Sequence, residues 1–479
     1  MRGERPDVLT ADRPKPGNYR IVALIVASTM LMEQIDATIL ATALPTIARE
    51  FGEPANTLSI LLTAYLLALA IFIPVSGRMA DRFGSRSVLR AAILIFMGSS
   101  LLCAFSTSVT EMGAARFLQG AAGAMMIPVG RLALLRAARK DELVSATAWL
   151  VTPALLGPIL GPPIGGLIVT HLDWRWIFYI NLPIGIAGIA AVSAYIDNIR
   201  AGTRGRPDFV GFAICAVGLG SLLMGCESVS RPGEAHHALA FLIVAALMGG
   251  VYAFHARRRL DPLLDLGMLR DRSFRLSLMG GSLTRITQGA QPFLLPLMFQ
   301  VGFGFSPAMS GMILLATAVG SLMAKTIVSP VMRRFGFRRS LIVNGLLSSL
   351  FYGLSGAFRA EWPMPAMMAV LVLAGFFMSF QFTVYNTVAY EHIEAERMSR
   401  ASSLYSTFQQ LLLSLGICTG AMVVQASMVW RGSLAPAARD FSAALAVVAL
   451  ISALAFFVNR SFAPDAGSAM SGHIPPDDQ

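Results

Sequence analysis

The sequence predicts an all-α membrane protein with 14 transmembrane helices and both termini in the cytoplasm. Of the 479 residues, 55% are hydrophobic and only 14% are charged, which leaves too few polar side chains to cover a soluble globule of this size. The apolar residues form stretches long enough to cross roughly 30 Å of hydrocarbon as helices. The basic residues gather in alternate loops and in both tails, which indicates that the two tails lie on the same side of the membrane and that the number of spans is even.

The apolar stretches are too long and too continuous to be strands of a membrane barrel, so we expect helices, which satisfy their own backbone polar groups in lipid. The first stretch continues to about Ile47 and lacks a small-residue cleavage site, so we expect it to remain as a span. The expected spans begin near residues 21, 57, 88, 112, 145, 176, 208, 238, 275, 307, 340, 364, 401 and 441.

Loop charge predicts the orientation of these spans. Of the 38 basic residues, 29 lie in the two tails and the even-numbered loops, whereas six lie in the odd-numbered loops. Because Lys and Arg collect on the cytoplasmic side, both ends of the chain are predicted to be cytoplasmic. This placement also accounts for the net charge of +11 without a nucleic-acid partner.

An internal repeat divides the chain into two halves. The segments 77–89 and 329–341 align at an offset of 252 residues, and the coinciding residues are Arg82/Arg334, Phe83/Phe335, Gly84/Gly336 and Arg86/Arg338. Two similar halves can build a secondary transporter, with the substrate path at their interface. The predicted divisions are a cytoplasmic tail (1–20), a six-helix bundle (21–200), two additional helices (201–260), a second six-helix bundle (261–460) and a cytoplasmic tail (461–479).

Two acids in the first span are the leading candidates for proton coupling. Glu33 and Asp36 are three residues apart and face the same way on a helix, and a charge at this depth costs roughly 2.5–3.5 kcal/mol. We expect Asp36 to take and release a proton, with Glu33 as a second acid or as a contact for cations. Arg116, early in the fourth span, would favour the ionised acid. The alternatives are hydrated acids near the helix end and a fixed structural ion pair.

Other polar residues inside spans are candidates for the substrate path. Lys325 is expected instead to extend toward the membrane surface. The candidates are Gln119, Arg285, Gln288, Gln291, Gln381, Tyr385 and Asn386.

Two further segments have patterns that composition alone does not explain. In the cytoplasmic loop Gly77 to Arg90, Asp81 lies among four arginines, which suits a charge latch between the halves; positive-inside topology would explain the arginines but not the acid or the glycines. The segment from Gly157 to Gly166 combines small residues that let helices approach closely with prolines that bend them. Generic helix packing is the alternative for this second segment.

These motifs resemble the major facilitator superfamily, specifically its 14-helix drug:proton antiporter branch, over most of the chain. The matching segments are the loop Gly77-x-x-x-Asp81-Arg82-x-Gly84-x-Arg86, the fourth-helix motif Arg116 to Gly123, the fifth-helix antiporter motif Gly157-x-x-x-Gly161-Pro162-Pro163-x-Gly165-Gly166, and the segments Asp36 to Pro45 and Trp174 to Pro183. The chain departs from the pattern where the first-helix motif usually has Asn, at Ala41 or Thr42. The second loop copy has Ser329 and Arg333 in place of Gly and Asp.

The resemblance implies a two-bundle fold with two extra central helices and proton-driven export of drugs or other amphipathic compounds by alternating access. It also implies a bacterial inner-membrane location, and it suggests a periplasmic adaptor protein as a partner. An exporter of one specific metabolite and a non-transporting membrane sensor or assembly protein are the alternatives.

Several other functional classes lack their required residues. No lysine lies in a GK[ST] phosphate loop, so ATP hydrolysis is not expected. The six histidines lie in loops or at span ends, which disfavours a haem enzyme, and the four cysteines form no CxxC pair for zinc. We therefore expect neither an enzyme nor a bound cofactor or metal.

Overall fold

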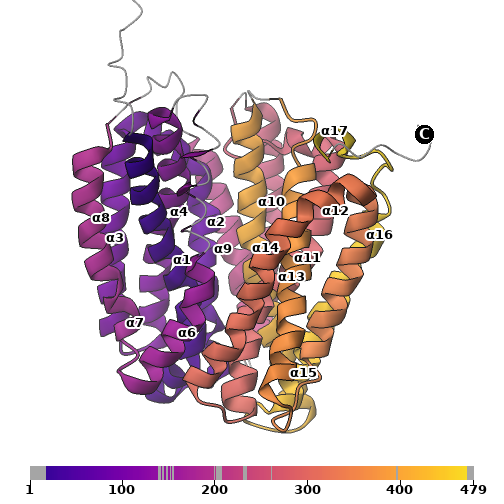
Figure 1. The fold of residues 1–479 in the computed structure, drawn as a ribbon. Coiled ribbons are helices and arrows are strands. Elements are labelled where there is room, and N and C mark those ends of the chain that lie inside the picture. The colour runs from indigo at the N-terminus through magenta and orange to yellow at the C-terminus, as the bar shows by residue number, and fades with distance from the viewer. Residues whose placement is uncertain are drawn as a thin grey trace, which may run out of the picture.

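The computed structural model describes residues 18–138, 142, 145, 146, 149, 150, 153, 156–198, 200, 208–229, 235–259, 261–394 and 397–471. Over these residues the chain is helical, and no strand forms (Figure 1). Residues 1–17 and 472–479 of the predicted tails lie outside the described residues, as do residues 201–207 and much of the span expected from residue 145.

The helices follow the predicted order. The N-terminal half contains α1 (Asn18–Phe51), η1 (Ala55–Leu58), α2 (Ser59–Phe83), α3 (Ser85–Phe105), α4 (Val109–Ala137), α6 (Leu156–His171), α7 (Trp176–Tyr179) and α8 (Asn181–Tyr195). The additional pair is α9 (Phe209–Val229) and α10 (Ala235–Arg258). The C-terminal half contains η3 (Leu266–Arg270), α11 (Arg272–Leu297), η4 (Met298–Gly302), α12 (Pro307–Ser355), α13 (Met364–Val388), α14 (Met398–Trp430), α15 (Ala438–Ala453), α16 (Ala455–Asn459) and α17 (Ser468–Ser471).

The all-helical membrane fold is confirmed, whereas the count of 14 spans is not. Eleven helical segments in the described part of the chain are long and apolar enough to cross a membrane. One of them, α12, covers the two spans expected from 307 and 340. Two of the expected spans are not among these eleven in the described residues. Helix α6 has only 16 residues, and the apolar run of α11 contains Arg285, Gln288 and Gln291.

The sequence repeat corresponds to a repeated backbone break. Gly84 ends α2 with φ +91°, and Gly336 interrupts α12 with φ +70°. Both values lie in the left-handed region that favours glycine. A Cβ on Gly84 would also collide with the side chain of Asn198, which accepts a hydrogen bond from the Ser87 backbone N–H at 3.2 Å.

The two halves stand side by side, with the additional pair along their junction (Figure 1). Helix α9 packs against α10, α2 and α14, so it contacts both halves. The halves themselves meet mainly where α2 contacts α14 and where α6 contacts α12. We call the end where α1 begins and α2 ends the basic end, and the other the opposite end.

The hydrophobic cores differ between the two ends. At the opposite end one core joins the halves, with Leu44 and Leu58 from one half packed in the same cluster as Leu294 and Val424 from the other. Toward the basic end each half has a core of its own. One core therefore joins the halves at the opposite end. Toward the basic end the main core of each half is its own, and α2 packs on the C-terminal half in smaller clusters.

Candidate transport site

A cavity of about 620 Å³ lies between the halves. Helices α1, α2, α4 and α6 form one wall, and α11, α12, α13 and α14 form the other. This volume falls within the range of small-molecule binding sites. The wall is largely apolar, and its charged side chains are Glu33 and Arg116 from the N-terminal half and Arg285 and Lys325 from the C-terminal half.

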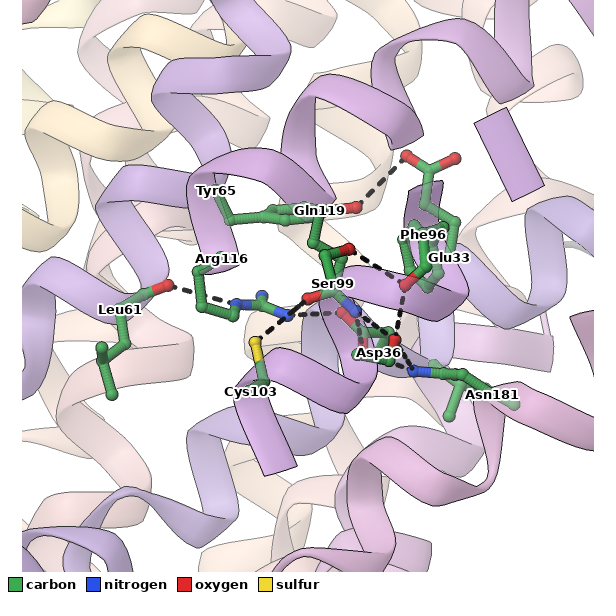
Figure 2. A network of polar contacts seen from close by, with 12 residues as sticks. Glu33, Asp36, Leu61, Tyr65, Phe96, Ser99, Cys103, Arg116, Gln119 and Asn181 are labelled. Carbon is green, nitrogen blue, oxygen red and sulfur yellow. Dashed lines mark hydrogen bonds and ion pairs between the residues drawn. The ribbon is translucent and has the colours of Figure 1, made fainter. Parts of the chain in front are cut away.

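Asp36 does not line the cavity and instead lies in a buried polar network within the N-terminal half (Figure 2). Arg116 donates from Nη1 to the Asp36 carboxylate at 2.5 Å, and both side chains are at most 1% exposed. The other carboxylate oxygen accepts from Gln119 Nε2 at 2.9 Å and from Asn181 Nδ2 at 2.8 Å. Burying two charges is costly unless each is paired and hydrogen-bonded, and this network supplies both.

Glycines in α4 make room for this arrangement. A Cβ on Gly120 would overlap the backbone carbonyl of Tyr65, and one on Gly123 would press on the Tyr65 hydroxyl and the Glu33 carboxylate. With that space open, the Arg116 guanidinium lies 4.5 Å from the centre of the Tyr65 ring. The fourth-helix motif therefore positions its arginine by letting α2 approach closely.

Glu33 is one helical turn from Asp36 but has a different environment. Its Oε1 accepts a hydrogen bond from the Tyr65 hydroxyl at 3.4 Å, and its Oε2 has no partner in the described part of the chain. Glu33 lines the cavity, whereas Asp36 does not. Arg116 connects the two environments, because it pairs with Asp36 and also contributes to the cavity wall.

The predicted substrate-path residues separate into three groups. Arg285, Gln288 and Gln291 line the cavity, and Gln381 and Tyr385 line a small adjoining pocket together with Arg285. Gln119 and Asn386 are not among the lining residues. Gln119 belongs to the Asp36 network, and the Asn386 side-chain oxygen accepts from Nε2 of the lining residue Gln409 at 2.8 Å.

Lys325 does not extend to the membrane surface as the sequence suggested. Its ammonium donates to the Thr383 hydroxyl at 2.8 Å, and the side chain lines the cavity. Three other contributors were missed: Tyr65 and Phe382 carry no sequence signal, and Asn181 was only part of a motif. Helix contacts between distant segments bring these side chains into the site.

The Gly77 to Arg90 loop contacts the C-terminal half through Arg78 rather than through Asp81. Asp81 pairs with Arg136 of α4 at 2.8 Å, within the N-terminal half. Arg78 of the same loop lies 2.9 Å from Asp261, which also lies 3.3 Å from Arg400 of α14. A latch between the halves that uses Asp81 stays a prediction.

The fifth-helix motif places α6 between α1 and α12. Gly157, Gly161 and Gly165 lie one turn apart and press against α1, where a Cβ on any of them would collide with α1 side chains. Gly166 lies on the backbone of Pro307, and Gly311 of α12 lies on the carbonyl of Pro162. The motif is thus a close contact between the halves at the opposite end, and Pro162 also lines the cavity.

The fold, the repeat and the central cavity agree with the comparison to known families. A sequence profile of the Major Facilitator Superfamily matches residues 26–256 and 277–475. The chain belongs to the Major Facilitator Superfamily. As a member of this superfamily, it is a multi-pass membrane transporter of small molecules.

Superfamily relatives match nearly the whole chain. It is 37% identical over 416 residues to the "Putative multidrug resistance protein MdtD" of Cronobacter sakazakii, covering 86% of this chain and 87% of that one. It is 35% identical over 410 residues to the "Probable transport protein HsrA" of Haemophilus influenzae, covering 85% and 88%.

Solved superfamily structures share the fold. The POT family transporter PepTSo has a TM-score of 0.69 at 13% identity, covering 96% of this chain and all of that one. The nucleoside transporter NupG has a TM-score of 0.64 at 14% identity, covering 92% and 99%.

Proposed function

We propose that this protein is a proton-coupled antiporter that exports amphipathic or hydrophobic compounds by alternating access. The observation that best supports the proposal is the shared position of Arg116, which pairs with Asp36 and faces the cavity. A proton on Asp36 and a substrate in the cavity would both act on this guanidinium. The names of the MdtD relatives support drugs as the substrate class.

The mechanism that we propose starts from the conformation described above. In this conformation the Asp36–Arg116 pair is formed and one core joins the halves at the opposite end, so we propose that substrate enters from the side that the basic end faces. After the halves rock, protonation of Asp36 removes the charge that holds Arg116. The freed guanidinium then changes the electrostatics of the cavity wall and so alters its affinity for substrate.

Glu33 is proposed as the second titratable group. Its unpartnered oxygen lies between the cavity and the Asp36 network, so it can contact cationic groups or pass protons inward. The Gly77 to Arg86 loop, with Asp81, Arg82 and Gly84, is proposed to latch the basic end when it closes. The close glycine contacts of α6 are proposed to guide the rocking motion.

We further propose that the basic end and both termini face the cytoplasm of a bacterium, with the protein in the inner membrane. The distribution of 29 of 38 basic residues supports this orientation. The membrane potential would then supply about 2.3 kcal/mol per charge per 100 mV to drive export. A periplasmic adaptor remains a proposed partner.

The test is substrate-driven proton release in everted membrane vesicles, with amphipathic probes of either charge. Wild type is expected to release protons when a transported probe is added, and Asp36→Asn is expected to abolish that release. Asp173→Asn, an exposed acid at the opposite end, is the matched control and is expected to behave as wild type. Unchanged coupling in Asp36→Asn would refute the assignment of Asp36. Absence of proton release in wild type with every probe would favour a sensor.

A further inference from the structure

The C-terminal half presents two cations to the cavity, and neither has an acidic partner among the described residues. Arg285 of α11 and Lys325 of α12 both line the cavity, yet neither takes part in any ion pair that these residues form. Arg285 is only 5% exposed, and its Nη1 has no hydrogen-bond partner in this part of the chain.

The two cations lie near one aromatic ring. The Arg285 guanidinium lies 5.0 Å from the centre of the Phe382 ring, and the Lys325 ammonium lies 5.8 Å from the same centre. The Arg285 guanidinium also lies 5.5 Å from the centre of the Tyr405 ring. Phe382 is 36% exposed, so its ring is open to a molecule in the cavity.

This arrangement leaves positive charge uncompensated. Charged side chains at membrane depth normally pair with an acid, and Arg285 is buried without one in the described part of the chain. Arg116 on the other wall satisfies this rule through Asp36. Among the described residues that line the cavity, Glu33 is the one acid, and it comes from the N-terminal half.

We propose that the ligands of this cavity are amphipathic organic anions. The anionic group, a carboxylate or sulfonate, bridges Arg285 and Lys325, and the apolar body lies on Phe382 and the apolar wall. The anionic group then forms charge-assisted hydrogen bonds with both cations and compensates their positive charge. The inference rests on the proposed function, since it takes the cavity as the transport site.

The experiment compares two permanently charged probes with the same ring system, naphthalene-1-sulfonate and (naphthalen-1-ylmethyl)trimethylammonium. Binding to purified protein in nanodiscs is measured for wild type, Arg285→Gln, Lys325→Gln and Lys325→Arg. Wild type is expected to bind the sulfonate about tenfold or more tightly than the cation, and each Gln variant is expected to lose about tenfold in sulfonate affinity. Lys325→Arg keeps the charge and is expected to retain binding.

The matched control is Arg334→Gln, because Arg334 also stacks on a phenylalanine but lies exposed at the basic end. It is expected to leave sulfonate affinity unchanged. Equal or tighter binding of the cationic probe, or sulfonate affinity that is insensitive to Lys325→Gln, would overturn the proposal. Sulfonate binding that depends on these cations but drives no proton release would instead contradict the proposed antiport. Proton release driven by the cationic probe alone would contradict the inference and leave the antiport standing.

Discussion

The two halves of the molecule treat buried charge in opposite ways. In the N-terminal half the Asp36 carboxylate and the Arg116 guanidinium neutralise each other within a hydrogen-bonded network. In the C-terminal half Arg285 has no such partner among the described residues and faces the cavity. At the 252-residue offset of the repeat, Glu33 is matched by Arg285 and Asp36 by Gln288. The same place in the repeat thus carries acids in one half and no acid in the other, which suits proton handling by the first half and ligand recognition by the second.

This division of roles requires both halves to close on one cavity, so separating them should have the largest effect. A side chain at Gly166 would be forced into the backbone of Pro307 and prevent α6 and α12 from meeting at the opposite end. We expect Gly166→Val to reduce transport into everted vesicles at least about tenfold. Gly98→Val is the control, because a Cβ on Gly98 meets nothing within 4 Å. Transport by Gly166→Val within twofold of this control would contradict the proposed contact.

Removing the arginine of each half tests the contrast in charge pairing. Arg116→Gln leaves Asp36 buried without its counter-charge and should destabilise the fold by about 3–5 kcal/mol. Arg285→Gln strands no acid and loses contacts with aromatic rings and a hydrogen bond with Tyr405, so the cost should be about 1–3 kcal/mol. The measurement is thermal unfolding of purified protein in one detergent. Equal losses in the two variants would show that the halves do not differ in this way.

The smallest effect is expected at the basic end, where charges are exposed. Asp261 has a side chain 53% exposed and lies near both Arg78 and Arg400. Exposed pairs of this kind contribute about 0.5 kcal/mol each on average, so the loss of both in Asp261→Asn should cost about 1 kcal/mol and change the transport rate about fivefold or less. The change should shrink as salt is raised, because the pairs are screened. A total loss of transport would mean that Asp261 belongs to the transport machinery itself.

Sequence patterns predicted the fold better than the site. Hydropathy and loop charge depend on composition along each segment, and the Gly84/Gly336 repeat predicted a shared backbone feature. The acid–base pair was also foreseeable, because Asp36 and Arg116 are isolated charges in apolar spans. Composition did not predict that Gln119 joins the Asp36 network or that Lys325 lines the cavity, because both depend on which face of each helix meets a neighbour. Tyr65 and Phe382 had no signal, since aromatic residues are common in any membrane helix.

The most direct test of this division of roles is a proton count on ligand binding, made with purified protein in weak buffer containing a pH-indicator dye. With saturating naphthalene-1-sulfonate, wild type should change the number of protons that it holds, whereas Asp36→Asn should bind the probe with near wild-type affinity and show no such change. Arg285→Gln should need about tenfold more probe and then show the same change as wild type. A proton change that persists in Asp36→Asn, or that is lost in Arg285→Gln at saturation, would contradict the assignment of protons to one half and ligand recognition to the other.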